Sequence, residues 1–270
     1  MKKLVIIILS LFLGLALRAQ DDVAPNRYAG LDSLLTQFYQ ALERESVEQK
    51  TVEFDFLISS CKDSLVRQYV ALEVFNHYRV RPRVMGEEEV ALNIYDKWIG
   101  SGIVKPRSEF EQFDAELFVK FNRASMLGMT AAPVTLEKLC GKMTIPRPGK
   151  VSVLFFYDTS CAKCNLEIQQ LPSLLEMVQS PIDFCAVYVG SEKRDFKAMN
   201  RNFKIKNRKV KVFHLWDPEV ESDYIMQYGV VGTPRMYLVL EDGTIAGRRL
   251  EVSNLAELFR LLNIIDGQEE

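Results

Sequence analysis

The feature of this 270-residue sequence that most restricts its fold is a continuous apolar run that ends shortly before two closely spaced cysteines. Residues 151–157 read Val-Ser-Val-Leu-Phe-Phe-Tyr, which is typical of a strand buried on both faces. Cys161 and Cys164 follow, and the residues from there to Gln179 have the pattern of a helix. We therefore predict that the pair stands where a central strand passes into a helix.

A two-residue spacer at a helix N-terminus lets the two sulfur atoms approach bonding distance and leaves the first sulfur at the positive end of the helix dipole. Cysteines in that position have pKa values of about 3.5 to 7.5, against about 8.5 for a free cysteine. Ala162 and Lys163 lie between the cysteines, and the Lys163 charge would favour the thiolate. We predict that Cys161 is the nucleophile and Cys164 the resolving thiol of a dithiol/disulfide pair.

Two other roles for the pair stay open at this point. A zinc site needs four ligands, and the chain offers one closely spaced cysteine pair and two histidines, His77 and His214. A purely structural disulfide is the second alternative, although a two-residue loop constrains the unfolded chain little. We favour redox chemistry, with no metal ion and no cofactor besides the redox-active Cys161–Cys164 disulfide itself.

The sequence beyond residue 131 alternates between predicted strands and predicted helices. A short hairpin around Cys140 is expected ahead of the central strand. Further strands are expected at 182–189, 210–215, 236–240 and 244–250, and further helices at 192–202, 218–228 and 254–264. This order closes on an antiparallel pair joined by Asp242-Gly243, and it predicts an α/β fold with a mixed sheet flanked by helices.

The earlier half of the chain has the spacing of helices instead. Apolar residues recur every three or four positions in four stretches, at 31–42, 65–78, 87–98 and 110–127. Arg81-Pro82-Arg83 would separate the second stretch from the third, because proline removes a backbone donor. The aromatic residues of these stretches are best explained as core. We predict a small all-α domain at 20–130 and the α/β domain at 131–270.

The first twenty residues predict the compartment. Lys2 and Lys3 precede an apolar run at 4–17, and small or polar residues follow Ala19, as in a secretory signal peptide. The run is shorter than the roughly 20 residues that cross a bilayer as a helix. We predict a signal peptide at 1–19, cleavage after Ala19 and an exported, periplasmic protein, in which disulfides can form. An uncleaved segment would instead anchor the chain to the membrane.

Charge and cysteine content restrict the partners. The chain holds 34 Lys and Arg against 36 Asp and Glu, a net charge of −2, which gives no electrostatic footprint of binding to nucleic acid or to a strongly anionic membrane surface. Five cysteines are too few for a disulfide-stapled scaffold. We expect protein thiols and disulfides as partners, a membrane electron donor if the pair acts as a reductant, and no nucleic acid.

The motifs together resemble the thioredoxin superfamily: a Cys-x-x-Cys pair after a strand, Val230-Val231-Gly232-Thr233-Pro234 before a strand, and the Asp242-Gly243 hairpin. The resemblance is closest to the exported TlpA/ResA-like branch and covers about residues 130–265. It implies a thioredoxin-like fold and thiol:disulfide exchange. It also implies that Pro234 is a cis-proline facing the disulfide, and that the peptide group at Thr233 binds an extended substrate.

Three positions depart from the superfamily pattern. Ser160 replaces the tryptophan that often precedes the first cysteine, which predicts a smaller or more polar rim of the substrate groove. Phe155 stands near the position of the buried aspartate of thioredoxin, and neither Asp158 nor Glu167 is an evident replacement. Arg235 replaces the small residue usual after the cis-proline. The redox potential therefore does not follow from the resemblance.

The other cysteines have simpler interpretations. Cys185 is expected as a small buried residue of a strand, Cys61 near the start of a helix, and Cys140 in a hairpin turn. A Cys61–Cys140 disulfide is left open, because sequence alone cannot support it. A copper site that adds His214 to the pair, like that of the Sco metallochaperones, is disfavoured because those proteins use a three-residue spacer.

The sequence thus predicts an exported thiol:disulfide oxidoreductase, most simply a reductase of protein disulfides. Changes at Ala162, Lys163 or Thr233 would set its direction, because about 30 mV corresponds to a tenfold change in the equilibrium constant. The alternative is a binding module, in which the helical domain recognises a partner and the thioredoxin-like half is a structural or weakly active scaffold. The intact Cys-x-x-Cys pair favours the enzyme.

Overall fold

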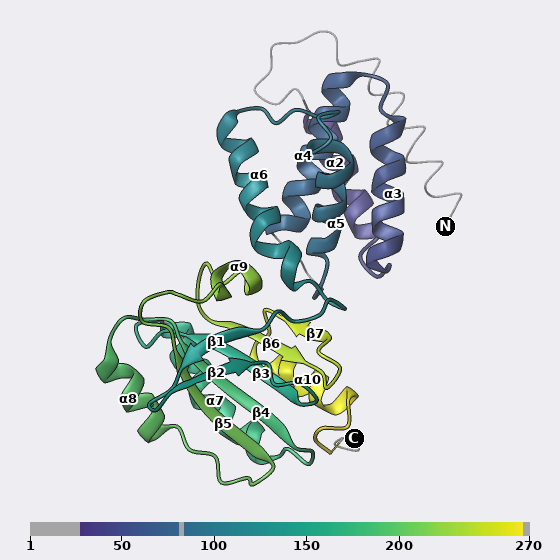
Figure 1. Cartoon of the computed structure of the whole chain (residues 1–270). Coiled ribbons are helices and arrows are strands. Elements are labelled where there is room, and N and C mark those ends of the chain that lie inside the picture. Colours follow the sequence, from purple (N-terminus) through teal and green to yellow (C-terminus); the bar gives the residue numbers. More distant parts are fainter. Residues whose placement is uncertain (1–27, 81–83, 267–270) are drawn as a thin grey trace. The chain divides into compact units, whose positions relative to one another are not determined.

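The computed structural model of the protein describes residues 28–80 and 84–266 (Figure 1). The chain divides into two compact units between Val119 and Lys120. The predicted signal peptide at 1–19 and the predicted break at Arg81-Pro82-Arg83 lie outside the described residues. Among the residues that are described, no helix combines the length and the apolar character that a membrane crossing requires.

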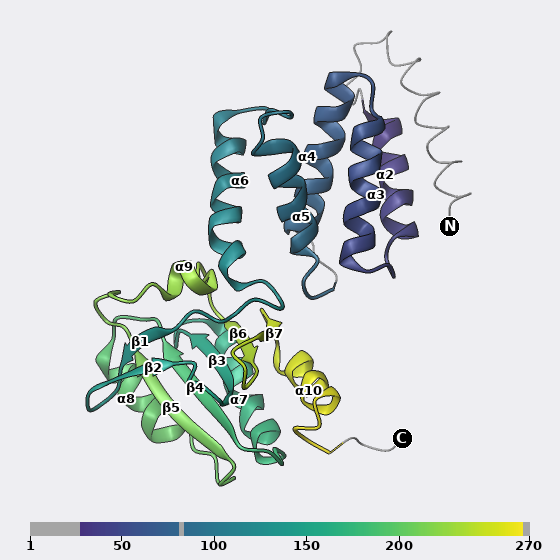
Figure 2. The same cartoon turned by 45° about the vertical axis from the view of Figure 1, so that its right-hand side comes forward.

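The first unit consists of helices, as predicted (Figure 2). They are α2 (Ala29–Ala41), α3 (Val47–Ser60), α4 (Ser64–Val80), α5 (Glu88–Ile94), the π-helical turn η1 (Tyr95–Ile99) and most of α6 (Glu109–Asn122). In α2 the buried residues Leu31, Leu34 and Phe38 recur at helical spacing, so one face of the helix turns inward.

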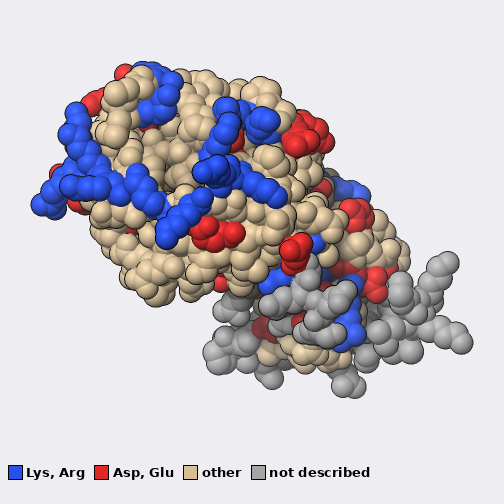
Figure 3. Space-filling view, turned by 90° about the horizontal axis from the view of Figure 1, so that it is seen from below, with Lys and Arg blue, Asp and Glu red and all other residues tan. Residues whose placement is uncertain are grey.

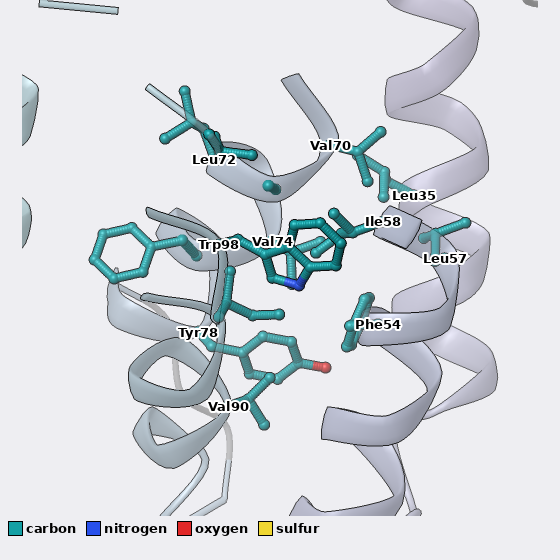
Figure 4. Close-up of a cluster of buried hydrophobic side chains, with 14 of the residues drawn as sticks. Leu35, Phe54, Leu57, Ile58, Val70, Leu72, Val74, Tyr78, Val90 and Trp98 are labelled. Atoms are coloured by element: carbon teal, nitrogen blue, oxygen red, sulfur yellow. The ribbon is translucent and has the colours of Figure 1, made fainter. Parts of the chain in front are cut away.

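The core of the helical unit is rich in aromatic residues (Figure 4). Phe54 of α3 meets Tyr78 of α4 edge to face, with ring centroids 5.4 Å apart. Trp98 is buried on η1 and donates its indole N–H to Asp55 at 3.1 Å. The interpretation of the aromatic residues as core is confirmed for these side chains, whereas Phe110 and Phe113 of α6 are exposed.

Helix α3 is the helix that the sequence pattern did not predict as a separate element. Its buried face includes the charged residue Lys50, whereas its apolar residues Val52 and Phe56 are exposed. Lys50 donates to the Glu87 carboxylate at 2.6 Å, and both side chains are buried. A helix that buries an ion pair and exposes apolar side chains breaks the periodicity on which the prediction depends.

The second unit contains the short 3₁₀ turn η2 (Arg123–Ser125) and one seven-stranded sheet of order β2-β1-β5-β4-β3-β6-β7. The strands are β1 (Val134–Glu137), β2 (Lys142–Ile145), β3 (Val151–Tyr157), β4 (Ile182–Tyr188), β5 (Val210–Trp216), β6 (Arg235–Val239) and β7 (Ile245–Arg248). The three central strands β3, β4 and β5 are parallel, and the strands outside them pair antiparallel. The predicted mixed sheet is therefore confirmed.

Four helices accompany the sheet: α7 (Ala162–Glu176), α8 (Lys193–Asn202), α9 (Tyr224–Tyr228) and α10 (Val252–Leu261). Strand β4 is buried along its whole length and β3 nearly so, which explains their unbroken apolar sequences. Phe156 of β3 stacks near Tyr224 of α9, whereas Phe184 of β4 stacks on Phe203, which follows α8. Both faces of the central strands are thus covered.

The helix expected at 218–228 is wrong in extent, because only Tyr224–Tyr228 is helical. Val220 has a positive φ of 52°, which a helix cannot contain. The buried Asp217 carboxylate instead accepts hydrogen bonds from the N–H groups of Glu221 and Ser222, each at 2.9 Å. A side chain that bonds nearby backbone N–H groups favours a turn over a helix.

The division between the units lies earlier than the position between residues 130 and 131 expected from the sequence. Backbone hydrogen bonds attach the intervening segment to the end of the sheet, from Gly128 N–H to the Ile245 carbonyl at 2.9 Å and from Ala131 N–H to the Gly243 carbonyl at 2.8 Å. In addition, Asn122 accepts a hydrogen bond from the buried Arg248 at 3.0 Å.

Candidate active site at the Cys161–Cys164 pair

Cys161 occupies the N-cap position of α7, immediately after the turn that follows β3. Its Sγ accepts a hydrogen bond from the Cys164 N–H at 3.1 Å. An N-cap side chain normally satisfies one of the free N–H groups of the first helical turn, and here a sulfur atom takes that place. The thiolate form of Cys161 would accept this bond more strongly and would also gain from the helix dipole.

Side chains of the turn hold Cys161 in place. Asp158 accepts hydrogen bonds from the N–H and the hydroxyl of Ser160, at 2.8 and 2.7 Å. The Thr159 hydroxyl donates to Asp195 of α8 at 3.0 Å, and the Asn165 side chain donates back to the Thr159 carbonyl at 3.1 Å. Ser160, predicted as a small polar rim residue, is exposed. Asp195 and Asn165 were not predicted, because no motif distinguishes them.

The loop before β6 approaches the same sulfur atom. The Thr233 carbonyl lies 3.4 Å from the Cys161 Sγ, and the Thr233–Pro234 peptide bond is cis. Cys161 and Thr233 are 72 residues apart in sequence. They meet because β6 pairs antiparallel with β3, so that β6 begins where β3 ends. Thr233 and Pro234 are half-buried, and Gly232 before them is exposed.

The environment of Cys161 favours its thiolate. Partial burial by itself raises the pKa of Cys161, but hydrogen bonds to the sulfur outweigh burial, and the pKa is lowered from its ordinary value. The donors are the thiol and N–H of Cys164, the Thr233 side chain and the backbone N–H of Lys163. Cys161 is also half-exposed, so its sulfur is accessible to a partner.

Cys164 has the opposite character. It is fully buried on the inner face of α7, and burial raises its pKa to about 11, with a further rise from its hydrogen bond to Cys161. One sulfur is therefore half-exposed with a lowered pKa, whereas the other is buried, keeps its proton and donates it toward the first. This asymmetry is the arrangement that a nucleophile and a resolving thiol require.

The residues between the cysteines are both exposed. The Lys163 ammonium forms an ion pair with Glu251 at 2.5 Å, a partner that the sequence did not indicate. Lys163 lowers the pKa of Cys161 through its backbone N–H, a contribution that the sequence did not indicate. Ala162 presents only a methyl group at the helix start.

Two positions that depart from the superfamily pattern are also defined. Phe155 is fully buried in β3, so no carboxylate lies at that position. Glu167 is buried on α7, one turn beyond Cys164, and it accepts a hydrogen bond from the Val252 N–H at 2.8 Å. Arg235 is half-buried and donates to the Pro234 carbonyl at 3.4 Å.

The remaining cysteines are free thiols. Cys185 is buried in β4, as predicted, and Cys140 is exposed in the turn of the hairpin. Cys61 is buried in the short connection between the end of α3 and the start of α4 at Ser64, which agrees with its expected place near a helix start.

His214 lies within β5, and burial lowers its pKa to about 4. Across residues 28–80 and 84–266, no group of three or more His, Cys, Asp or Glu side chains could hold a metal ion.

A search of solved structures found several chains with this architecture. A thioredoxin-like protein from Bacteroides caccae is 13% identical, with a TM-score of 0.66, over 90% of this chain and 88% of that protein. A thiol:disulfide interchange protein from a Bacteroides species is 21% identical, with a TM-score of 0.44, over 54% of this chain and 95% of that one.

The thioredoxin domain of a thiol-disulfide oxidoreductase from Bacteroides vulgatus is 20% identical, with a TM-score of 0.43, over 50% of this chain and 96% of that domain. A scan against protein-family models found no match, and neither did a search of curated proteins. The similarity to the Bacteroides caccae protein establishes the fold. The chain therefore has a thioredoxin-like fold, a mixed sheet flanked by helices and preceded by an all-α unit, which confirms the fold class predicted from the sequence.

Proposed function

We propose that the protein is an exported thiol:disulfide oxidoreductase of the TlpA/ResA-like kind, which reduces disulfides of other proteins. The observation that carries the proposal is the asymmetry of the pair: Cys161 is half-exposed with a lowered pKa, and Cys164 is buried with a raised pKa. The cis-proline loop lies beside Cys161, with the Thr233 carbonyl 3.4 Å from the Cys161 Sγ.

The reaction follows from the two sulfur atoms. The Cys161 thiolate attacks one sulfur of a substrate disulfide, which forms a mixed disulfide and releases the other substrate sulfur as a thiolate. Cys164 then gives up its proton and attacks the Cys161 sulfur. This second exchange forms the Cys161–Cys164 disulfide and releases the reduced substrate. Two electrons pass from the pair to the substrate, and a membrane electron donor outside this chain would restore the dithiol.

The peptide groups around Pro234 would position the substrate. Proline has no N–H group, so Pro234 itself donates no hydrogen bond at this place. The carbonyls of the loop and the N–H groups of the neighbouring residues are left to bond to an extended segment of a substrate. Val231 and Gly232 are exposed in front of it. An extended stretch of a partner protein could pair with this edge and bring its disulfide to Cys161.

Trapping of mixed disulfides tests the proposal. In a Cys164→Ala variant the second exchange cannot occur, so the chain should accumulate covalent complexes with its partners. A Cys161→Ala variant should accumulate none, because the buried Cys164 thiol cannot be reached. Cys140→Ala is the matched control, because Cys140 is exposed but stands away from any helix start, and it should behave like the unchanged chain.

Two results would count against the proposal. Complexes in the Cys161→Ala variant and none in Cys164→Ala would exchange the two roles. Complexes in neither variant would favour the alternative of a binding module with an inactive thioredoxin-like scaffold. The compartment is checked separately, by recovery of the processed chain from the periplasmic fraction.

A further inference from the structure

The second unit carries a concentration of positive charge that the net charge of the chain conceals. Residues 193–211 contain nine of the 34 basic residues and one of the 36 acidic residues, so this segment carries +8 and the rest of the chain −10. The basic residues are Lys193, Arg194, Lys197, Arg201, Lys204, Lys206, Arg208, Lys209 and Lys211, which we call the basic face. All nine are exposed, and Figure 3 shows Lys and Arg gathered in a band with few acidic side chains between them.

The local structure turns these side chains outward. Along α8, Lys193, Lys197 and Arg201 recur every fourth residue and share one face, while Phe196 and Met199 are buried on the other. In the connection from α8 to β5, exposed basic residues alternate with half-buried residues. Lys204, Lys206 and Arg208 are exposed there, and Ile205 and Asn207 between them are half-buried.

Asn207 fixes that connection. Its side-chain amide donates to the carbonyls of Leu175, Glu176 and Val178 at the end of α7, at 3.1, 3.2 and 2.8 Å. Its carbonyl oxygen accepts from the Lys209 N–H at 3.0 Å. The loop that carries the cations is therefore held against the body of the unit, and the charges form a preorganised array.

The basic face is also short of ion pairs. Among the described residues, Arg194 is the only one of the nine that forms an ion pair, with its neighbour Asp195 at 3.3 Å. Elsewhere on the surface some exposed cations are matched, as Lys97 is with Asp55 and Arg107 is with Glu73 and Glu111. Unmatched like charges repel one another, so the array favours an external anion.

The composition of the array favours one class of partner. Six of the nine are lysines, which protein–protein interfaces generally avoid, and residues 193–211 include no large exposed hydrophobic side chain that could anchor a protein partner. The two phenylalanines near the array that could stack with bases, Phe196 and Phe203, are buried. Clusters of four to eight lysines and arginines beside a membrane-spanning segment or on an amphipathic helix bind anionic lipids, and the basic face offers a comparable cluster of positive charge.

We propose that the basic face binds the anionic surface of a lipid bilayer. The loop part of the face precedes β5, whereas Cys161 follows the other end of the parallel strand β3. Strands of seven residues place these two edges of the sheet about 20 Å apart. The start of α8 lies nearer to Cys161, because Asp195 accepts a hydrogen bond from Thr159. A bilayer bound through the loop and the later part of α8 would therefore leave the Cys161 thiol open to proteins in solution.

Vesicle binding tests this proposal with the full chain. Vesicles of phosphatidylcholine alone are compared with vesicles that contain about one third phosphatidylglycerol. The apolar segment at 4–17 would contribute equally to both, so the difference between them reports the electrostatic part. We expect binding to the anionic vesicles to be roughly tenfold stronger or more, and to fall as salt is raised, because salt screens exposed charges.

Two variants with four substitutions each show which residues cause the preference for anionic vesicles. In the first, Lys197, Arg201, Lys206 and Arg208 are changed to Glu. In the second, Lys62, Lys105, Lys138 and Arg260, which are exposed but lie outside the basic face, are changed to Glu. The two variants have the same net charge, and in neither do the replaced side chains hydrogen-bond to the described residues. The first should lose the preference for anionic vesicles, and the second should keep most of it.

Equal loss in both variants would overturn the proposal, because net charge alone would then explain the binding. Retention on a heparin column without binding to anionic vesicles would also overturn it and would indicate another polyanion. The orientation is checked in a Cys140→Ser background by the alkylation rate of Cys161. That rate should stay within about twofold when the chain is bound to vesicles, and strong protection would contradict the proposed orientation.

Discussion

At the scale of single residues, the chemistry depends on where two identical side chains stand. Cys161 caps a helix and is half-exposed, whereas Cys164 lies one turn later on the buried face of the same helix. Burial acts on both thiols, but only Cys161 receives enough hydrogen bonds to reverse its effect on the pKa. The two-residue spacer produces this difference, because it turns the second cysteine toward the sheet.

The first prediction concerns the pH dependence of Cys161. Alkylation by iodoacetamide requires the thiolate, so its rate falls as the pH falls through the pKa of the thiol. Because the pKa of Cys161 is lowered, the midpoint of the reaction should lie below the value of about 8.5 at which a free cysteine is half-ionised. Peptide mapping after a short reaction separates Cys161 from Cys140. A midpoint at or above 8.5 would contradict the assignment.

The second prediction concerns Thr233. Its side chain is one of the groups that lower the pKa of Cys161, so Thr233→Val should raise that pKa and slow alkylation at neutral pH. The cis-proline remains in this variant. Thr135→Val, an equal change at an exposed position of β1, is the matched control and should leave the rate unchanged. An unchanged rate in Thr233→Val would show that the Thr233 side chain does not act on the sulfur.

At the scale of elements, most of the second unit follows from its sequence. Strands buried on both faces are continuous apolar runs, so β3, β4 and β5 were predicted within one residue at each end. Helix α9 was predicted too long, because nothing in the sequence indicates that Asp217 binds backbone N–H groups and that Val220 has a positive φ. Helix α3 was not separated, because its buried face includes a paired lysine.

The residues of the active site also differ in how far the sequence predicts them. The cysteine pair and its place at a helix start were predicted from local sequence alone. The approach of Thr233 and Pro234 was implied by the resemblance to the thioredoxin superfamily, since residues so far apart give no local signal. The positioning residues Asn165 and Asp195 could not be predicted, because their hydrogen bonds depend on the conformation of the turn after β3.

The third prediction tests how the connection between α8 and β5 is held. Asn207→Ala removes three hydrogen bonds to the end of α7 and should lower the free energy of unfolding of the second unit by about 2 kcal/mol. Urea unfolding followed by Trp216 fluorescence, in a Trp98→Phe background, measures this unit. Asn202→Ala, at an exposed position, should change the free energy by less than about 0.5 kcal/mol. Equal effects of both changes would contradict the anchoring role of Asn207.

At the scale of the whole molecule, two properties were hidden from composition. The net charge of −2 averages a strongly basic segment with an acidic remainder, and a local count along the sequence would have revealed it. The boundary between the units was expected near residue 130 because the helical pattern ends there. The segment 120–131 instead bonds to β7 and to the turn before it, a pairing that periodicity cannot detect.

The fourth prediction follows from that boundary. A fragment of residues 120–270 should fold and keep the alkylation behaviour of Cys161, because it contains the whole sheet and the cis-proline loop. A fragment of residues 131–270 lacks Asn122, which accepts from the buried Arg248, and should be less stable by about 2 kcal/mol or more. Urea unfolding of the two fragments compares them, and equal stability would place the boundary at the later position.

The central claim is that Cys161 and Cys164 form a redox-active pair, and its most direct test is the equilibrium of the pair with glutathione. The purified chain is incubated at a series of glutathione potentials, and the free thiols are trapped and identified by peptide mapping. We predict one reversible two-electron transition between dithiol and Cys161–Cys164 disulfide, with a midpoint nearer to about −270 mV, as in reducing relatives, than to about −120 mV. A pair that stays a dithiol at every potential, or that pairs with Cys140 instead, would contradict the account.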